Sequence, residues 1–425
     1  MGAGAFLEPL VVVTLLFGGA YFNRNKDYSF KDGKTTAAGW GPDATHHKKH
    51  DDLHPSRSGS PEGWSSSSSP SLLAHDISSH RRRRVKAFGY EKFVTTPNTL
   101  IFKDRFLSRV LQKFPFLAEC WYWALLYWVY QVGRAFTALT LVEGTVDVAR
   151  RHALQLIHLE QRLHIFWEIG FQQWFLEHPT LLHWINRTYS FIHIPGTIFF
   201  LVILYYLTTT RKRRVMSGRV NSDNVSAGPA LYEARRRTMA MCNLIAFVIF
   251  TLWPCMPPRL LSDPNYKGEN AEEAKSFGFV DTVHSKTGES SVWTTNKFCN
   301  QYAAMPSLHF GYSLLIGLTV ATLPINGLRP TSWKRIAIVV GGMCYPALIL
   351  TAIVATANHF ILDAVAGAIV CAIAWNTNDL LLNLCVLEDY FLWVLRMHKP
   401  VNYTDPETAV DPDVQSSLLL GEEAA

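Results

Sequence analysis

The sequence predicts an all-α protein, a polytopic transmembrane helical bundle of about six core spans that follows an N-terminal anchor helix. Charged residues make up only 17% of the 425 residues, whereas hydrophobic residues reach 48%. A soluble domain carries about 25% charged residues, so this balance indicates a membrane protein. The 13 tryptophans and 16 tyrosines are typical of the aromatic belts at the two membrane surfaces.

Apolar segments long enough to cross a hydrocarbon core of about 30 Å recur along the chain, and in this form only helices can cross it. They lie near residues 118–142, 189–208, 239–257, 305–323, 335–355 and 361–384. Between the first two, residues 146–184 place apolar side chains at helical spacing among polar ones, which predicts a helix lying on the membrane surface. Glu160 and Glu168 are expected to face water on this helix.

The remaining sequence divides into flanking regions. Residues 1–22 are apolar except for Glu8 and lack the positive start of a secretory signal, so they are predicted to form a transmembrane anchor. Residues 23–117, rich in Ser, His, Lys and Arg, are predicted to be a disordered basic cytoplasmic linker. Residues 118–384 would form the membrane domain, and residues 385–425 a cytoplasmic tail.

The basic residues set the expected orientation. The runs 211–214 and 235–237 both lie between the second and third core spans, which places that connection in the cytoplasm. Counting spans from there, residues 259–302 and the turn at 355–360 lie on the opposite, lumenal or extracellular side. The basic run 81–84 then falls on the cytoplasmic side, as the same rule requires.

Charge and cysteine usage limit the classes of partner. The net charge of +6 would suit nucleic acid, but the basic runs flank apolar segments and have no base-stacking platform, so we expect no nucleic-acid partner. The seven cysteines show no metal-ligand spacing, which argues against a zinc site. Cys255 and Cys299, which the predicted topology brings to one face, are a candidate disulfide.

Two short motifs begin the fourth and the sixth core spans at the outer membrane surface. They are Ala304–His309 and Asn358–Asp363. In the second motif His359 and Asp363 are four residues apart and share one face of a helix, so the carboxylate can hydrogen-bond one imidazole nitrogen. The other nitrogen is then available as a nucleophile. The spacing alone is a weak signal, because it also occurs by chance.

The stronger signal is the convergence of three segments on one membrane surface. Arg259, His309 and the pair His359 and Asp363 come from separate spans, and ionisable groups at this depth are costly unless paired or functional. They predict an anionic substrate, first of all phosphate, with Arg259 holding its oxygens, one histidine attacking phosphorus and the other protonating the departing oxygen. Each residue also has a structural alternative: a backbone-bonded His309, a helix-capping Asp363, and an Arg259 that reaches toward lipid headgroups.

At these residues the sequence resembles the type 2 phosphatidic acid phosphatase superfamily, in the branch of fungal inositol phosphorylceramide synthases and related bacterial membrane proteins. The resemblance covers about residues 118–384. Beyond the two motifs it rests on Glu160–Leu163, Phe166–Glu168, 186–207, Pro257–Leu261 and Gly278–Thr282. It implies that His359 forms a phosphohistidine, that Asp363 orients it, that His309 is the general acid, and that no metal or other cofactor is needed.

The sequence departs from the superfamily's phosphatases at two positions. They usually carry Arg six residues before the nucleophilic His, where this chain has Ile353, and Gly before the first catalytic His, where it has Leu308. Both departures resemble the synthase branch and leave Arg259 as the candidate phosphate-binding residue. Asp281 and His284 in the outer loop are interpreted as a solvated pair and are not assigned to the site.

The resemblance implies a membrane enzyme that transfers a phosphate-containing headgroup and has membrane lipids as partners: a phosphoinositide, ceramide or a lipid phosphate. It implies a Golgi or endoplasmic reticulum membrane, with the site facing the lumen. With water as the acceptor, the same site would make a lipid phosphate phosphatase. A catalytically silent scaffold or transporter is the alternative from another class, although a transporter would more naturally carry its charges near the middle of the bilayer.

Overall fold

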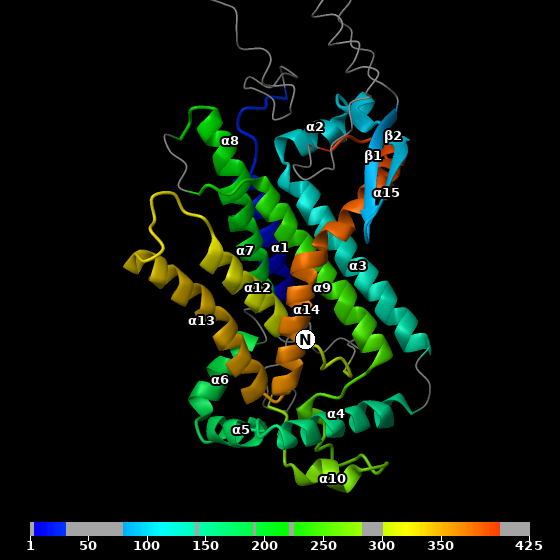
Figure 1. The fold of residues 1–425 in the computed structure, drawn as a ribbon, viewed down its shortest axis with the longest axis vertical. Helices are drawn as coiled ribbons and strands as arrows, with labels where there is room; N and C mark the ends of the chain where they lie inside the picture. The colour runs from blue at the N-terminus through cyan, green and yellow to red at the C-terminus, as the bar shows by residue number, and fades with distance from the viewer. Residues whose placement is uncertain are drawn as a thin grey trace, which may run out of the picture. The chain divides into compact units, whose positions relative to one another are not determined.

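The computed structural model describes residues 4–30, 80–140, 144–189, 193–220, 225–282 and 301–399. The chain forms two compact units (Figure 1). Unit 1 comprises Met1–Arg24 and Phe114–Leu381, and unit 2 comprises Asn25–Lys113 and Leu382–Ala425. Within the described residues, the strands both belong to unit 2 and unit 1 is helical. The predicted all-α fold is therefore confirmed, with one β-hairpin added to it.

Each predicted core span coincides with a helix of unit 1. These helices are α3 (Phe116–Thr140), α7 (His193–Tyr205), α9 (Pro229–Leu252), α12 (Leu308–Thr322), α13 (Trp333–Ala355) and α14 (Ile361–Thr377), preceded by α1 (Gly4–Phe22). Among the described residues, three helical stretches are long and apolar enough to cross a membrane: His193–Met216, Trp333–Ala355 and Ile361–Val394. The first of them continues from α7 through a π-helical turn, η4 (Tyr206–Thr210), into α8 (Arg211–Met216). The chain is therefore a membrane protein.

The cationic run 235–237 was expected in a cytoplasmic loop, but it lies inside α9, which begins at Pro229. Arg236 Nη1 lies 2.7 Å from Glu119 Oε2 of α3, and Arg237 Nη2 lies 3.0 Å from Asp379 Oδ1 in η6 (Asn378–Leu384). Burying a charge in a helical bundle is costly unless it is paired, and these partners meet that cost. The run therefore contributes to packing between helices.

Glycines bring α12 close to its two neighbours. A Cβ atom on Gly317 of α12 would lie 2.7 Å from the carbonyl oxygen of Gly342 in α13. A Cβ atom on Gly311 would lie 3.1 Å from the carbonyl oxygen of Gly367 in α14, and one on Gly367 would collide with the Ser307 carbonyl. Small residues allow helix backbones to approach in this way inside a membrane. They place the start of α12 directly against the start of α14.

Short helices cover one end of this bundle. The predicted surface helix at 146–184 is divided into α4 (Thr145–Arg162), α5 (Glu168–Leu176) and α6 (Pro179–Arg187). In Figure 1, α4 and α5 run across the bundle at the end where α13 stops and α14 begins. The apolar face of α4, including Ile157, packs in a buried cluster with Phe360, the residue that precedes α14.

Unit 2 is built around a hairpin of β1 (His80–Ala87) and β2 (Tyr90–Pro97), which pair antiparallel. It also contains η2 (Thr99–Phe102), α2 (Phe106–Lys113) and α15 (Cys385–Val394). Arg83 of β1 donates two hydrogen bonds to Asp389 of α15, at 2.7 and 2.8 Å, and both side chains are buried.

The predicted disordered linker 23–117 is therefore wrong over the described residues 23–30 and 80–117. Its composition was judged locally, whereas the partner that neutralises Arg83 lies in the predicted tail. Residues 31–79 and 400–425 lie outside the described residues.

Candidate active site

His359 lies in the turn between α13 and α14 and is 6% exposed. Its Nδ1 is 2.7 Å from the carbonyl oxygen of Ala304. Because a carbonyl oxygen only accepts hydrogen bonds, Nδ1 carries the hydrogen and the neutral ring has its lone pair on Nε2. The Ala304 carbonyl therefore sets the tautomer that a nucleophilic histidine requires.

Asp363 is fully buried in the first turn of α14 and has two contacts. Its Oδ2 accepts a hydrogen bond of 2.9 Å from the Phe360 amide and lies 3.5 Å from His359 Nδ1. Helix capping and a place beside His359, which do not exclude one another, thus occur together. The Asp363 carbonyl also accepts a hydrogen bond of 2.9 Å from the Ser307 amide, which joins α14 to the residue that caps α12.

Glu160 and Glu168 were expected to face water, but both side chains are fully buried. Glu168 Oε1 accepts a 2.9 Å hydrogen bond from the Ile361 amide, and Glu160 Oε1 accepts a 2.8 Å bond from the Leu362 amide. The first amides of a helix have no partner within it, and a buried helix end needs acceptors from elsewhere. The two glutamates supply them, and together with Asp363 they hold α14 in place.

Burial, together with the neighbouring Glu168 carboxyl, raises the pKa of Glu160 from 4.5 to about 9. Glu160 thus keeps in the folded state a proton that the unfolded chain releases. Its contribution to stability is fully present below pH 4.5 and is lost as the pH rises toward about 9.

We expect the melting temperature in detergent to fall from about pH 5 to about pH 9, and to fall less in Glu160→Gln, whose side chain is neutral throughout. The matched control is Glu177→Gln on the exposed end of α5, which should keep the wild-type slope. An equally steep slope in Glu160→Gln would contradict a protonated Glu160.

His309, in the first turn of α12, lies beside His359. Their ring centroids are 5.7 Å apart. The His309 ring also contacts Tyr189 and His193, each with a centroid distance of 4.8 Å. Two imidazoles, one from α12 and one from the turn before α14, therefore share one site, which suits attack by one and proton transfer by the other. Tyr189 and His193 were not assigned from the sequence, although both lie in the matching stretch 186–207.

Arg259, in the short helix η5 (Pro258–Leu260), is joined to the segment that carries His359. Its amide donates to the Ala357 carbonyl at 2.9 Å, its Nε to Asn358 Oδ1 at 2.9 Å, and its Nη1 to Asp281 Oδ2 at 3.1 Å. Asp281 was interpreted as part of a solvated loop, but it forms an ion pair with Arg259 and its side chain is only 25% exposed. Asn358 and Asp281 therefore hold the Arg259 guanidinium in one orientation by hydrogen bonds to two of its nitrogens.

Replacing Arg259 by lysine is expected to raise the KM for a lipid phosphate about ten- to hundredfold, the effect of losing one hydrogen bond to a charged group. A lysine ammonium has no fork and cannot reach Asn358 and Asp281 together. The matched control, Arg151→Lys, changes an exposed arginine of α4 that pairs with Glu269. Steady-state kinetics of both variants would test this, and an unchanged KM in Arg259→Lys would exclude Arg259 from substrate binding.

Other sequence-based candidates do not join the site. Within the described residues, no group of three or more His, Cys, Asp or Glu side chains could hold a metal ion. Cys255 is buried, whereas its candidate partner Cys299 lies outside the described residues, as does His284.

The fold defines a polytopic helical membrane protein whose candidate site gathers two imidazoles, buried carboxyls and a guanidinium at one end of the bundle. A family model described as the PAP2 superfamily matches residues 154–220 and 224–377, just over half of the chain, and the chain belongs to this superfamily. It is therefore a membrane enzyme of the lipid phosphatase or phosphotransferase type. Comparisons with curated proteins and with solved structures give no match.

Proposed function

We propose that this enzyme transfers a phosphate-containing headgroup, as an inositolphosphotransferase does, from a phosphoinositide to a hydroxyl such as that of ceramide. The observation that carries the proposal is the hydrogen bond between His359 Nδ1 and the Ala304 carbonyl, at 2.7 Å. It leaves Nε2 as the nucleophilic nitrogen in a site that also holds the His309 ring. A covalent histidine intermediate divides one displacement at phosphorus into two easier steps.

In the first step, His359 Nε2 attacks phosphorus, the bond from phosphorus to the lipid oxygen breaks, and protonated His309 gives its proton to that oxygen. In the second step, the acceptor hydroxyl attacks the phosphohistidine, neutral His309 takes the hydroxyl proton, and the bond from phosphorus to Nε2 breaks. Both histidines return to their starting states. Arg259 holds non-bridging phosphate oxygens, and Asp363 with the two buried glutamates keeps the segment of His359 in position.

A phosphatase would use water in the second step, and the position six residues before His359 bears on this choice. Ile353 is fully buried in α13, and its carbonyl accepts hydrogen bonds from the amides of Asn358 and His359, at 3.0 and 3.2 Å. Position 353 thus carries an uncharged side chain, whereas the phosphatases usually have an arginine six residues before the nucleophilic histidine. This supports Arg259 as the phosphate-binding residue and favours the transferase.

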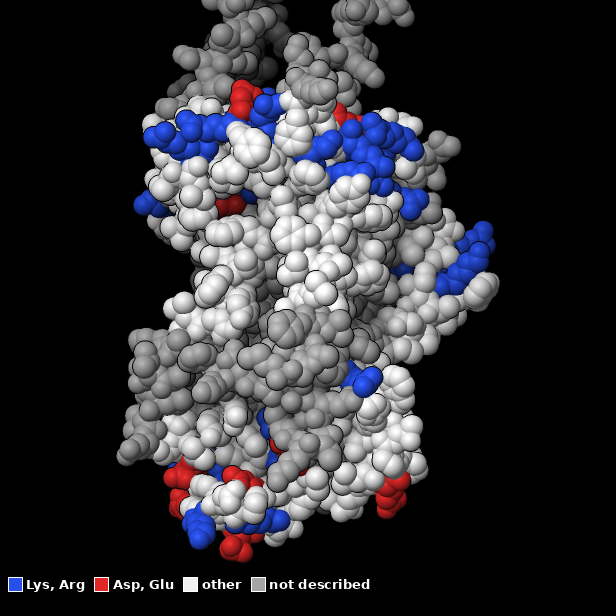
Figure 2. Space-filling view, turned by 180° about the vertical axis from the view of Figure 1, so that it is seen from behind, with Lys and Arg blue, Asp and Glu red and all other residues white. Residues whose placement is uncertain are grey.

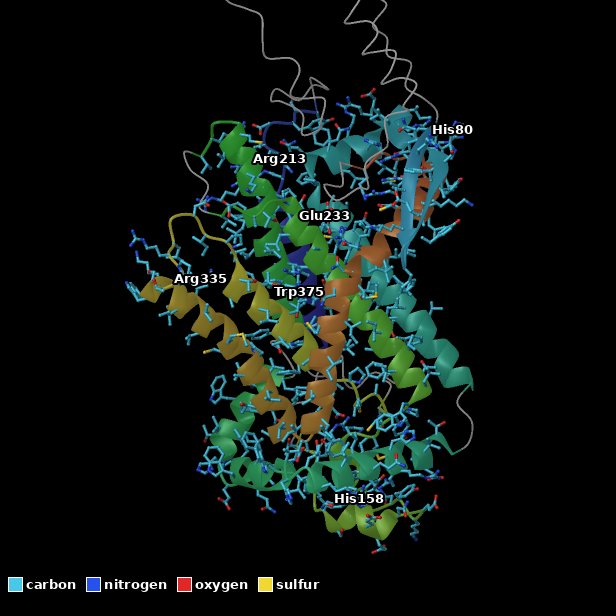
Figure 3. The ribbon with its side chains drawn as sticks, viewed as in Figure 1. His80, His158, Arg213, Glu233, Arg335 and Trp375 are labelled. Atoms are coloured by element: carbon cyan, nitrogen blue, oxygen red, sulfur yellow. The ribbon has the colours of Figure 1, made fainter. Side chains whose placement is uncertain are left out.

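The ends of unit 1 differ in charge. Arg213 of α8 and Arg335 of α13 lie toward one end, away from His158 of α4 (Figure 3). Figure 2 shows acidic side chains, with some basic ones among them, at the end with α10 (Ala271–Ser276), next to a largely uncharged bundle surface. By the positive-inside rule, we assign the end with α4 and the candidate site to the non-cytoplasmic side of the membrane, which is the lumenal side if the enzyme resides in the Golgi or endoplasmic reticulum.

The decisive experiment offers the purified enzyme a panel of labelled phosphoinositides and lipid phosphates, with ceramide, with inositol and with neither. Label that moves to an added hydroxyl would establish the transferase, and release of inorganic phosphate without an acceptor would establish the phosphatase. A folded protein that is inert on every substrate would support the silent scaffold. If inositol proves to be an acceptor, a lumenal site in sealed vesicles of cytoplasm-out orientation should use added inositol only after the membrane is opened.

A further inference from the structure

The turn of the unit 2 hairpin holds an apolar side chain out in solvent. Phe88 and Gly89 connect β1 to β2 and have φ angles of 49° and 85°, so both lie in the left-handed region. Two-residue hairpin turns of this kind favour Asn or Asp followed by Gly. A bulky side chain is strained there, and Phe88 is 95% exposed. Neither turn geometry nor packing within the fold accounts for a phenylalanine at this position.

The strands beside the turn carry further aromatic and basic side chains on the surface. Tyr90 is 68% exposed and Phe93 is 42% exposed. Arg82, Lys86 and Lys92 are also exposed, and none of these three cations forms an ion pair with another described residue. The hairpin tip, defined as Arg82–Phe93, thus combines exposed aromatic rings with positive charge.

The opposite side of the hairpin is already occupied. Besides the buried pair of Arg83 and Asp389, the Lys86 amide donates to Asn383 Oδ1 at 2.9 Å, and Asn383 Nδ2 donates to the Lys86 carbonyl at 3.0 Å. Arg81 also lies 4.0 Å from Asp389. These contacts fix one face of β1 to the segment that holds α15, so the exposed face of the hairpin tip is presented on a rigid support.

We propose that the hairpin tip docks onto an anionic lipid surface. Phe88 and Tyr90 would enter the headgroup layer, and the three exposed cations would meet lipid phosphates. Aromatic side chains favour the interface between membrane and water, and each nearby Lys or Arg adds attraction to an anionic leaflet. Because the chain is a membrane protein, a surface of lipid headgroups is always close to it. This binding site involves none of the residues of the candidate active site.

The test places an environment-sensitive fluorophore beside the turn of the full-length protein. Ala87→Cys, which leaves the docking residues in place, is labelled in a Cys299→Ser and Cys344→Ser background, because Cys344 is exposed and Cys299 lies outside the described residues. The protein is reconstituted in nanodiscs of neutral lipid, or of neutral lipid mixed with phosphatidylserine, each with a lipid that quenches at headgroup depth. We expect quenching in the anionic discs, weakened by added salt.

Variants identify the groups responsible. Phe88→Asn gives the turn its preferred Asn-Gly sequence, so it keeps the hairpin folded while removing the apolar contact, and it should reduce quenching. Joint replacement of Arg82, Lys86 and Lys92 by glutamate should weaken docking by at least about fivefold per charge. The matched control is Phe106→Asn, a 73% exposed phenylalanine in α2, which should leave quenching unchanged.

Equal quenching in neutral and anionic discs would overturn the proposal, as would quenching that survives both Phe88→Asn and the triple charge reversal. A label that stays unquenched in every disc would also overturn it and would favour a protein as the binding partner of the hairpin tip.

Discussion

Replacing His359 by asparagine is expected to lower phosphate release or transfer by on the order of 10⁴-fold or more, the size of effect seen when an enzyme loses its nucleophile. An asparagine amide can still donate to the Ala304 carbonyl, which now accepts from His359 Nδ1 at 2.7 Å. The fold should therefore persist while the nitrogen that attacks phosphorus is missing.

Activity should be measured together with the trapped intermediate. Wild-type protein quenched during turnover should carry the acid-labile phosphate-containing group on His359, and the asparagine variant should carry none. The matched control is His158→Asn, which changes a half-exposed histidine of α4 that contacts Glu273 at 2.8 Å. Equal activity in wild type and His359→Asn would remove His359 as the nucleophile.

Replacing Gly367 by alanine is expected to cost about 1–3 kcal/mol of stability, as overpacking does, and to remove most of the activity. The new methyl group would collide with the Ser307 carbonyl, so α12 and α14 must separate. His309 lies in α12 and His359 lies just before α14, so separating the helices would move the two histidines apart. A shift of about 1 Å between reacting groups can lower a rate about 10²-fold.

Gly341→Ala provides the control, because no atom lies within 4 Å of a Cβ built at that glycine of α13. Alanine there should be neutral or stabilising by up to about 1 kcal/mol through helix propensity. Thermal unfolding in detergent and activity should be compared for both variants. If Gly367→Ala matched Gly341→Ala in both assays, the close contact between α12 and α14 would not be needed to position the histidines.

The helices were predictable because a membrane makes hydropathy decisive: an apolar stretch of spanning length must satisfy its own backbone hydrogen bonds. The same reasoning placed the start of α9 too late, near residue 239 instead of at Pro229, because it counted the arginines at 235–237 as loop residues. Their partners Glu119 and Asp379 lie more than a hundred residues away. The hairpin was missed for the same reason, since the carboxylate that neutralises Arg83 comes from Asp389.

The central residues of the candidate site were predictable from two local motifs and from the topology that brings their helix starts together. Their hydrogen-bond partners were not. Hydropathy assigns Glu160 and Glu168 to water, and only the position of the buried start of α14 shows that they are its acceptors. The sequence did give one indication of their importance: both glutamates lie in stretches that match the family, Glu160–Leu163 and Phe166–Glu168. In the same way, Asp281 lies in the matching stretch Gly278–Thr282.

The capping of α14 also bears on how the protein is made. Glu160 precedes its hydrogen-bond partner Leu362 by 202 residues, so during synthesis α4 is complete long before the helix it caps. Burial and the nearby Glu168 raise the pKa of Glu160 to about 9 in the folded protein. We therefore expect the packing of α14 against Glu160 to be accompanied by uptake of a proton at neutral pH.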